Sequence, residues 1–211
     1  MRSNGWLKQG SSWYYLAGSG AMQTGWLSKG GSWYWLDPES GRMATGWEKA
    51  SDGKWYYFSG SGAMQTGWTK LGSTWYYLTG SGAMATGWLG LGGTWYWLDP
   101  DSGTMATGWE KASDGKWYYF DGSGAMRTGW LEIGSDRYYL NASGAMQTGW
   151  LHVGDSWYWL DHDSGKIATG WLQILESWYY FRPTTGTMAT GAVMIEGTRY
   201  VFDVSGACLN R

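Results

Sequence analysis

The sequence predicts an all-β protein built as a solenoid of stacked β-hairpins, with about three hairpins in each turn. Three observations favour this fold: a Gly-Trp pair recurs every 20 or 21 residues, glycine contributes 36 of 211 residues, and aromatic residues make up 19% of the chain. A unit of this length buries its apolar surface only by stacking on its neighbours, as in other solenoids. Helices are not expected, because glycine is too frequent and no 3.6-residue period is visible.

The repetition occurs at two levels. The block 6–67 is followed by 68–129, with twelve mismatches over 62 positions, and then by 130–191, with one residue lost and one gained. Each block holds three units, marked in order by Trp-Tyr-Tyr-Leu, Trp-Tyr-Trp-Leu-Asp and Trp-Tyr-Tyr-Phe, except that Arg137 replaces the tryptophan of the first of these patterns in the third block. This order follows if the coil returns to the same side every three units, and duplication of a 62-residue block explains it equally well. We expect one repeat module over residues 1–211, with about ten hairpins and a cap at 192–211.

Each unit is expected to form one hairpin, because aromatic strand residues are bounded by turn residues. Alternation within the first such strand places Trp13 and Tyr15 on one face and Tyr14 and Leu16 on the other. We expect the face of Tyr14 and Leu16 to pack inside the coil. The face of Trp13 and Tyr15 is then free to meet the next hairpin.

Composition and charge exclude several functions. The formal net charge is −2 and no basic run occurs, which argues against nucleic-acid binding. No stretch of 18 apolar residues exists, so no membrane span is expected. Cys208 is the single cysteine and cannot form an internal disulfide. Met1-Arg2-Ser3-Asn4 leads directly into the first Gly-Trp, so the chain looks like a piece of a longer protein.

We expect no catalytic residue, metal ligand set or cofactor. His152 and His162 lie in different parts of a unit and are interpreted as surface or turn residues. The acidic stretches that begin at Asp37, Asp99 and Asp161 stand where turns are predicted, and Asp favours turns for backbone reasons. Calcium at these turns is a weaker alternative, because the spacing of an EF-hand is absent.

The aromatic residues indicate binding of a diffuse cation. A groove between stacked hairpins would be walled by uncharged rings, and the negative face of each ring attracts a quaternary ammonium. Three such contacts at about 0.5–2 kcal/mol each give an affinity near the millimolar range. Many weak sites in one chain suit a polymer that displays the ligand repeatedly.

The pattern Gly-Trp…Trp-Tyr-Tyr-Leu…Ser-Gly-Ala-Met-x-Thr-Gly-Trp resembles the choline-binding repeat of streptococcal, pneumococcal-type cell-wall hydrolases and surface proteins. The resemblance recurs nine times and covers nearly the whole chain. It implies a left-handed superhelix with sites between consecutive hairpins. The implied ligand is choline or phosphocholine on teichoic and lipoteichoic acids, and the implied location is secreted and cell-wall associated. A choline-linked homodimer is a further expectation.

In that family, a site takes two tryptophans from one hairpin, an aromatic residue from the next hairpin, and often a methionine. Carried over, this pattern implies six complete choline-binding sets: Trp6, Trp13, Met22 and Trp35; Trp26, Trp33, Met43 and Tyr57; Trp47, Trp55, Met64 and Tyr77; Trp68, Trp75, Met84 and Trp97; Trp88, Trp95, Met105 and Tyr119; and Trp109, Trp117, Met126 and Tyr139.

Three later sets depart from the pattern. In the seventh, Arg137 replaces a tryptophan beside Trp130, Met146 and Trp159, and its charge is expected to repel choline. The eighth keeps Trp150, Trp157 and Tyr180 but has Ile167 in place of methionine. The ninth has Trp171, Trp178 and Met188, but Val201 replaces the closing ring. Ala192 and Arg199 mark the tenth unit as a cap.

The sequence therefore predicts a non-catalytic module that binds choline on the cell wall and anchors an attached hydrolase or surface domain. The alternative is a glucan- or carbohydrate-binding repeat domain, as in glucosyltransferases or clostridial toxins. Such sites generally lack the doubled tryptophan of each hairpin, so the tryptophan pair seven or eight residues apart favours choline. A spacer that binds nothing is a third reading, which the degenerate C-terminal units support locally.

Overall fold

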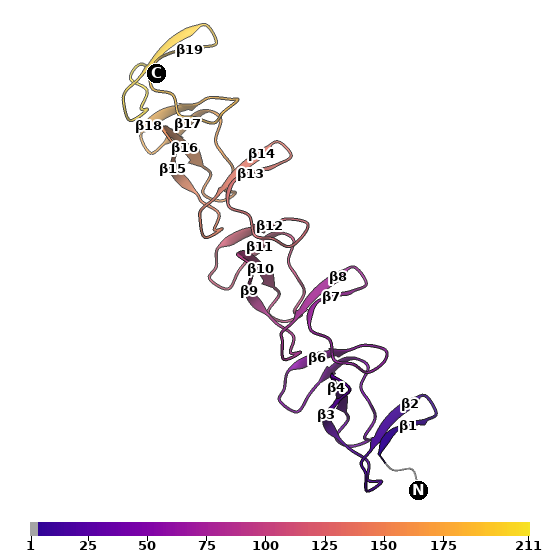
Figure 1. The fold of residues 1–211 in the computed structure, drawn as a ribbon. Helices are drawn as coiled ribbons and strands as arrows, with labels where there is room; N and C mark the ends of the chain where they lie inside the picture. Colours follow the sequence, from indigo (N-terminus) through magenta and orange to yellow (C-terminus); the bar gives the residue numbers. More distant parts are fainter. Residues whose placement is uncertain (1–3) are drawn as a thin grey trace. The chain divides into compact units, whose positions relative to one another are not determined.

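The computed structural model describes residues 4–211. Within these residues all named secondary-structure elements are β-strands. The twenty strands pair consecutively into ten antiparallel hairpins, and each hairpin is a separate two-stranded sheet (Figure 1). The all-β, repeated-hairpin fold expected from the sequence is confirmed. The handedness of the coil and the number of hairpins in each turn stay predictions. No helix long and apolar enough to cross a membrane is present within residues 4–211.

The chain forms two compact units, of which the first ends at Ala106 and the second begins at Thr107. The strands of the first unit are β1 Gly5–Gln9, β2 Ser12–Leu16, β3 Gly25–Lys29, β4 Ser32–Leu36, β5 Gly46–Lys49, β6 Trp55–Phe58, β7 Gly67–Leu71, β8 Thr74–Leu78, β9 Gly87–Leu91 and β10 Thr94–Leu98. The strands of the second unit are β11 Gly108–Lys111, β12 Trp117–Phe120, β13 Gly129–Ile133, β14 Asp136–Leu140, β15 Gly149–Val153, β16 Ser156–Leu160, β17 Gly170–Ile174, β18 Ser177–Phe181, β19 Gly191–Ile195 and β20 Thr198–Phe202.

Glycine at the hairpin tips allows the chain to reverse within a few residues. Gly30 and Gly31 connect β3 to β4 with φ values of 59° and 78°, a region that side chains with a Cβ rarely occupy. Leu175 takes the same kind of position between β17 and β18 with a φ of 55°. Glycine takes this position in most other tips, and Glu196 takes it in the last hairpin with a φ of 50°.

The linkers join successive hairpins within each unit. The linker that follows β4 bridges to its own hairpin at Leu36↔Met43, and the Met43 N–H donates to the Trp13 carbonyl of the preceding hairpin at 2.8 Å. Equivalent bonds tie Met64 to Trp33 in the first unit and Met188 to Trp157 in the second. Each linker therefore fixes the spacing of two consecutive hairpins.

The largest fully buried side chains of each unit come from the second strands of the hairpins. The fourth aromatic-strand residue is fully buried in most hairpins, and examples are Leu36, Leu78 and Phe58. Within each compact unit, burial of these side chains provides apolar contact between stacked hairpins, as expected for a solenoid. Leu27, Leu131 and Ile195 on first strands and several alanines are also buried, and the other buried side chains are aromatic.

The face assignment made from strand alternation needs a correction. Trp33 and Trp35 do share one face of β4, but Trp33 is 48% exposed and Trp35 is only 3% exposed. The next hairpin covers the linker end of the strand, where Trp35 packs on Tyr56 and Phe58, and leaves the tip end open. The third position of the Trp-Tyr-Trp-Leu pattern, Trp35, therefore belongs to the core, whereas the first position, Trp33, stays accessible to solvent.

Candidate ligand-binding cages

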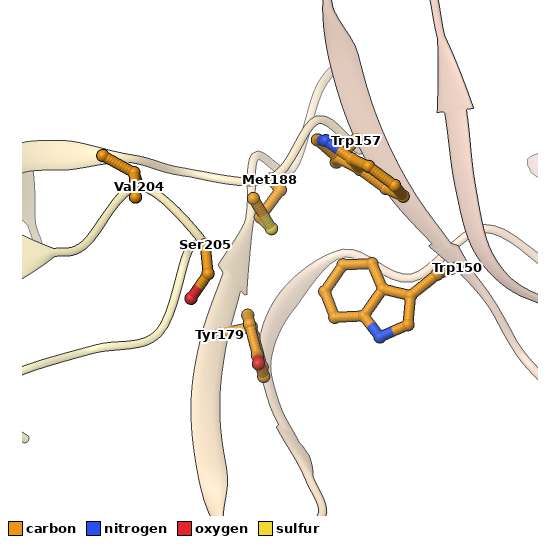
Figure 2. Close-up of a pocket in the computed structure, with 6 residues that line it drawn as sticks. All are labelled: Trp150, Trp157, Tyr179, Met188, Val204 and Ser205. Carbon is orange, nitrogen blue, oxygen red and sulfur yellow. The ribbon is translucent and has the colours of Figure 1, made fainter.

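An open cavity lies where the tryptophans of one hairpin face the next hairpin (Figure 2). Trp150 from β15 and Trp157 from β16 stand nearly perpendicular, with ring centroids 6.1 Å apart. Tyr179 from β18 faces Trp150 at 5.0 Å, and Met188 in the following linker also lines the cavity. The volume is about 400 Å³, within the range of small-ligand sites. We call such a group a cage and number it by the hairpin that supplies the tryptophans, so this one is cage 8.

The same four-residue arrangement recurs along both units. Cages 2, 3 and 6 enclose about 420, 310 and 350 Å³. In cages 1 and 4 the first tryptophan faces the next tyrosine at 4.8 and 4.9 Å, and the methionine is held by the same backbone bond. The sets are Trp6, Trp13, Tyr34 and Met43 for cage 1; Trp26, Trp33, Tyr56 and Met64 for cage 2; Trp47, Trp55, Tyr76 and Met84 for cage 3; Trp68, Trp75, Tyr96 and Met105 for cage 4; and Trp109, Trp117, Tyr138 and Met146 for cage 6.

Backbone geometry places the methionine against the rings. In cage 2 the Met64 N–H donates to the Trp33 carbonyl, which brings the linker alongside β4. Gly82, with a φ of 85°, leaves the space that the Met64 side chain needs, because an added Cβ would overlap its Sδ. The thioether is polarizable and favourable beside aromatic rings. Glycine in the next turn is thus a condition for a closed cage.

The tyrosine of cage 2 is held in one orientation and one protonation state. The Tyr56 hydroxyl donates to Asp52 Oδ2 at 2.8 Å. Burial, followed by this hydrogen bond, raises the pKa of Tyr56 to about 12. The shift keeps the hydroxyl protonated up to a higher pH than in an exposed tyrosine, and the residue lines the cavity of cage 2.

The two tryptophans, the tyrosine and the methionine of each cage carry no formal charge, and part of each wall is open to solvent. Trp33, Trp95 and Trp157 are 48%, 49% and 44% exposed. Large apolar rings grouped at a concave surface mark a binding site rather than a fold requirement. Such walls can stabilise a cation through several ring faces at once, but they offer no nucleophile or base.

The structure regroups the methionines expected from the sequence. Each methionine lines the cage before the expected one: Met43 contributes to cage 1, Met64 to cage 2 and Met84 to cage 3, whereas they were expected in sets two, three and four. The reason is the backbone bond from each linker to the preceding hairpin. Met22, assigned to the first set, lies instead beside Gly41 and is 48% exposed. Met126 packs beside Gly144, and Met188 belongs to cage 8, where the sequence predicted Ile167.

The structure also regroups the closing ring. The second position of the Trp-Tyr-Tyr-Leu pattern, which we call the middle position, closes each cage, as Tyr56 does in cage 2. From the sequence, this position was expected to be part of the core. The third residue instead packs against the first tryptophan of its own hairpin, as Trp35 does with Trp26 at 5.1 Å. The residues placed in this way within their own hairpins are Trp35, Tyr57, Tyr77, Trp97, Tyr119, Tyr139 and Tyr180. The tryptophan pairs are brought together as expected, including Trp88 and Trp95 at 6.2 Å.

Cage 7 contains an internal cation. Arg137 stands on β14 in place of the second tryptophan, and its guanidinium lies 4.8 Å from the Trp130 ring centroid. Its Nη1 donates to the Thr185 carbonyl at 3.0 Å, and its Nε lies 3.1 Å from a Glu132 oxygen. Tyr158 still faces Trp130 at 4.8 Å. The arginine thus fills part of this cage as well as bringing a charge of the wrong sign for a cationic ligand.

The acidic turns have a structural role. Asp37 Oδ1 accepts hydrogen bonds from the Ser40 N–H at 2.7 Å and the Ser40 hydroxyl at 2.6 Å. These bonds hold the pKa of Asp37 below its usual value. Asp99 and Asp161 make the same bonds to Ser102 and Ser164. The expectation that Asp stands at these turns for backbone reasons is confirmed.

The next turn along the coil supplies the cage rim, which differs from cage to cage. Gly80 and Ser81 line cage 2, whereas Asp101 and Ser102 line cage 3. In cage 6 the rim carries Asp163 and also Lys166, whose ammonium lies 2.7 Å from an Asp136 oxygen. The walls are therefore alike, but the charge at the entrance is not.

The two histidines lie beside tryptophans. His152 stacks on Trp157 with centroids 4.7 Å apart, and His162 meets the edge of Trp159 at 5.0 Å. Within residues 4–211 there is no group of three or more His, Cys, Asp or Glu residues placed to hold a metal ion.

These repeats and cages define a protein of stacked aromatic hairpins, and sequence comparison identifies its class. The choline-binding repeat family matches residues 3–46, 44–87, 65–108, 85–128, 127–170 and 168–210. The chain belongs to this family, whose modules are generally binding domains rather than catalysts and are associated with the streptococcal cell surface. No curated protein sequence matches the chain.

Solved structures agree with this assignment. Choline-binding protein F of Streptococcus pneumoniae, in the presence of a peptidoglycan analogue, is 32% identical with a TM-score of 0.79, over 99% of this chain and 86% of that one. CbpJ of S. pneumoniae TIGR4 is 29% identical with a TM-score of 0.69, over 97% and 93%. The choline-binding domain of CbpL from S. pneumoniae is 28% identical with a TM-score of 0.52, over 100% and 99%.

Proposed function

We propose that this chain is a non-catalytic module that holds an attached hydrolase or surface domain on the cell wall by binding choline or phosphocholine of teichoic and lipoteichoic acids. One observation carries the proposal: two perpendicular tryptophans of one hairpin, with the tyrosine and methionine of the next, surround a cavity without formal charge, as in cage 2. Family membership supports choline as the ligand. The quaternary ammonium gains cation–π contact with three rings.

Repetition converts weak cages into a wall anchor. Cages 1 to 4 lie in the first unit and cages 6 and 8 in the second. A polymer that displays many choline groups engages several cages together, which raises the overall affinity about 10²–10⁴-fold over one site. The whole module, residues 1–211, is proposed to act as one anchor.

Thermal unfolding with two ligands tests the function. Choline at millimolar concentration is expected to raise the unfolding temperature, because it binds only the folded cages. A glucan oligomer at equal concentration is expected to leave it unchanged, because the cage walls place few hydrogen-bonding groups around the cavity. Stabilisation by the glucan and none by choline would support a carbohydrate-binding repeat domain instead.

Two further readouts complete the proposal. Purified cell walls incubated with the chain are expected to release no sugar or choline fragments, and release would overturn the non-catalytic assignment. Sedimentation with and without choline tests the choline-linked homodimer. A choline-dependent rise in mass is the expected result, and an unchanged mass would remove that part of the proposal.

A further inference from the structure

The ninth hairpin carries a complete set of cage rings, although the sequence indicated a defective site. Trp171 from β17 faces Tyr200 from β20 with centroids 4.8 Å apart and planes at 72°. Trp150 and Tyr179 in cage 8 lie 5.0 Å apart at the same 72°. The replacement of an aromatic residue by Val201 does not open this cage, because the closing ring comes from the middle position of the strand.

The fourth wall of cage 9 is also built in the usual way. The Cys208 N–H donates to the Trp178 carbonyl at 2.8 Å, as the Met188 N–H does to the Trp157 carbonyl. Cys208 thus stands at the place of the methionine and bridges to Phe202. Cage 9 therefore has two tryptophans and one tyrosine at the positions of the other cages, with a sulfur-bearing residue at the methionine position.

A cation of the chain itself lies in this cage. The Arg211 guanidinium carbon is 4.1 Å from the Trp171 ring centroid and 3.7 Å from the Trp178 centroid. Both distances are within the range of a cation–π contact. Among residues 4–211, none of the salt bridges involves Arg211. The rings are therefore the main partners of its charge.

The segment before Arg211 is fixed to the hairpin, so the arginine is delivered to the rings. The Leu209 N–H donates to the Val201 carbonyl at 2.9 Å. The Asn210 side chain accepts from the Val201 N–H at 2.9 Å and donates to the Arg199 carbonyl at 3.2 Å. A tethered group is present at high effective concentration, even when its own contact is weak.

We propose that Trp171, Trp178 and Tyr200 form a further binding site for a quaternary ammonium ligand and that Arg211 occupies it as an internal competitor. The proposal rests on the proposed function, because it takes choline as the ligand of the other cages. Arg211 differs from Arg137: removal of Arg137 leaves cage 7 with two rings, whereas removal of Arg211 leaves cage 9 with three. The ligand must displace the guanidinium. The apparent affinity of the ligand is therefore its affinity for the empty cage multiplied by the fraction of time that the cage is empty.

Choline-soaked crystals of the whole chain test the inference. The variants are Arg211→Ala, Asn210→Ala, which frees the segment but keeps the arginine, and Arg137→Ala as the two-ring comparison. Arg42→Ala, an exposed arginine outside the cages, is the matched control. Occupancy is measured in cage 9 against cage 8 over a series of choline concentrations. Unfolding temperatures without ligand verify that each variant is folded.

We expect Arg211→Ala to fill cage 9 at the concentration that fills cage 8, whereas the parent chain and Arg42→Ala need roughly tenfold more choline. Asn210→Ala should lie between them, and Arg137→Ala should leave cage 7 empty. An empty cage 9 in Arg211→Ala beside a filled cage 8 would overturn the inference and leave the proposed function intact. Equal filling of both cages in the parent chain would also overturn it. Choline in none of the cages would reject the proposed function, and the ninth site with it.

Discussion

At the scale of single residues, Leu175 shows the cost of a side chain at a glycine position. Its φ of 55° lies in the left-handed region, and its side chain is 93% exposed, so it gains little from packing. Leu175→Gly is expected to stabilise the protein by about 1 kcal/mol, because the left-handed backbone strains residues with a Cβ. Chemical denaturation measures the change.

The control for this prediction is Asp155→Gly. Asp155 is a tip residue of the preceding hairpin and does not have a positive φ, so glycine there should give no gain in stability. A destabilised Leu175→Gly variant, or an equal gain in both variants, would contradict the strain argument.

Tyr56 gives a pH prediction. Its folded pKa is raised from 10.0 to about 12, mainly by burial and then by the Asp52 hydrogen bond. Below pH 10 the folded and unfolded chains both keep this proton. Between pH 10 and 12 the unfolded chain loses it first, so the stability that this group contributes falls as the pH rises through 12. Tyrosinate absorbance should show Tyr56 and Tyr118, which has the same shift, titrating last.

Asp52→Asn separates the two causes of the shift. The pKa of Tyr56 should fall but stay above 10, because burial remains when the carboxylate is removed. Tyr118, which donates to Asp114, should be unaffected in the same sample. A Tyr56 pKa at or below 10 in this variant would show that burial is not the leading cause.

At the scale of elements, the turns control the cages that they border. Gly82 and Gly53 both have positive φ, 85° and 79°, but only at Gly82 would a Cβ meet another side chain, that of Met64. Gly82→Ala should therefore lose more stability than Gly53→Ala, and it should weaken choline binding in cage 2. Equal losses in the two variants would show that backbone strain accounts for the whole effect.

The rim turns predict different responses to phosphocholine. Asp101 lines cage 3, and Gly80 stands at the matching rim of cage 2. A carboxylate at the rim attracts the ammonium group but repels the phosphate, so cage 3 should prefer free choline over phosphocholine more than cage 2 does. Asp101→Asn should remove a preference of several-fold, and high salt should reduce it. Equal preferences in both cages of the parent chain would contradict this role for Asp101.

The sequence predicted the hairpins, their tips and the tryptophan pairs well, because those features depend on local patterns. It predicted that the next hairpin closes each cage, but not which aromatic residue of that hairpin and which methionine do so. The methionine depends on a backbone bond between the linker and the preceding hairpin, such as Met43 to Trp13. A signal was nevertheless present. The middle strand position is tyrosine in all ten units, whereas the third varies among Tyr, Trp and Val. The positions with an unvarying tyrosine are Tyr14, Tyr34, Tyr56, Tyr76, Tyr96, Tyr118, Tyr138, Tyr158, Tyr179 and Tyr200.

At the scale of the whole molecule, the cages are expected to bind free choline independently but the wall together. Trp33→Ala combined with Trp55→Ala removes one ring from each of cages 2 and 3. The other cages should keep their affinity for free choline, whereas retention on choline-bearing walls should fall by more than the lost fraction of sites. Retention that falls only in proportion to the number of cages would contradict multivalent binding.

The central claim is that each site joins the tryptophans of one hairpin to the tyrosine and methionine of the next. The most direct measurement is a crystal structure of this chain with bound choline. In cage 2 the trimethylammonium group should contact Trp26, Trp33, Tyr56 and Met64, with Trp35 remaining buried. Choline against Tyr57 and Met43 instead, or no choline beside the Trp26 and Trp33 rings at a saturating concentration, would contradict the account.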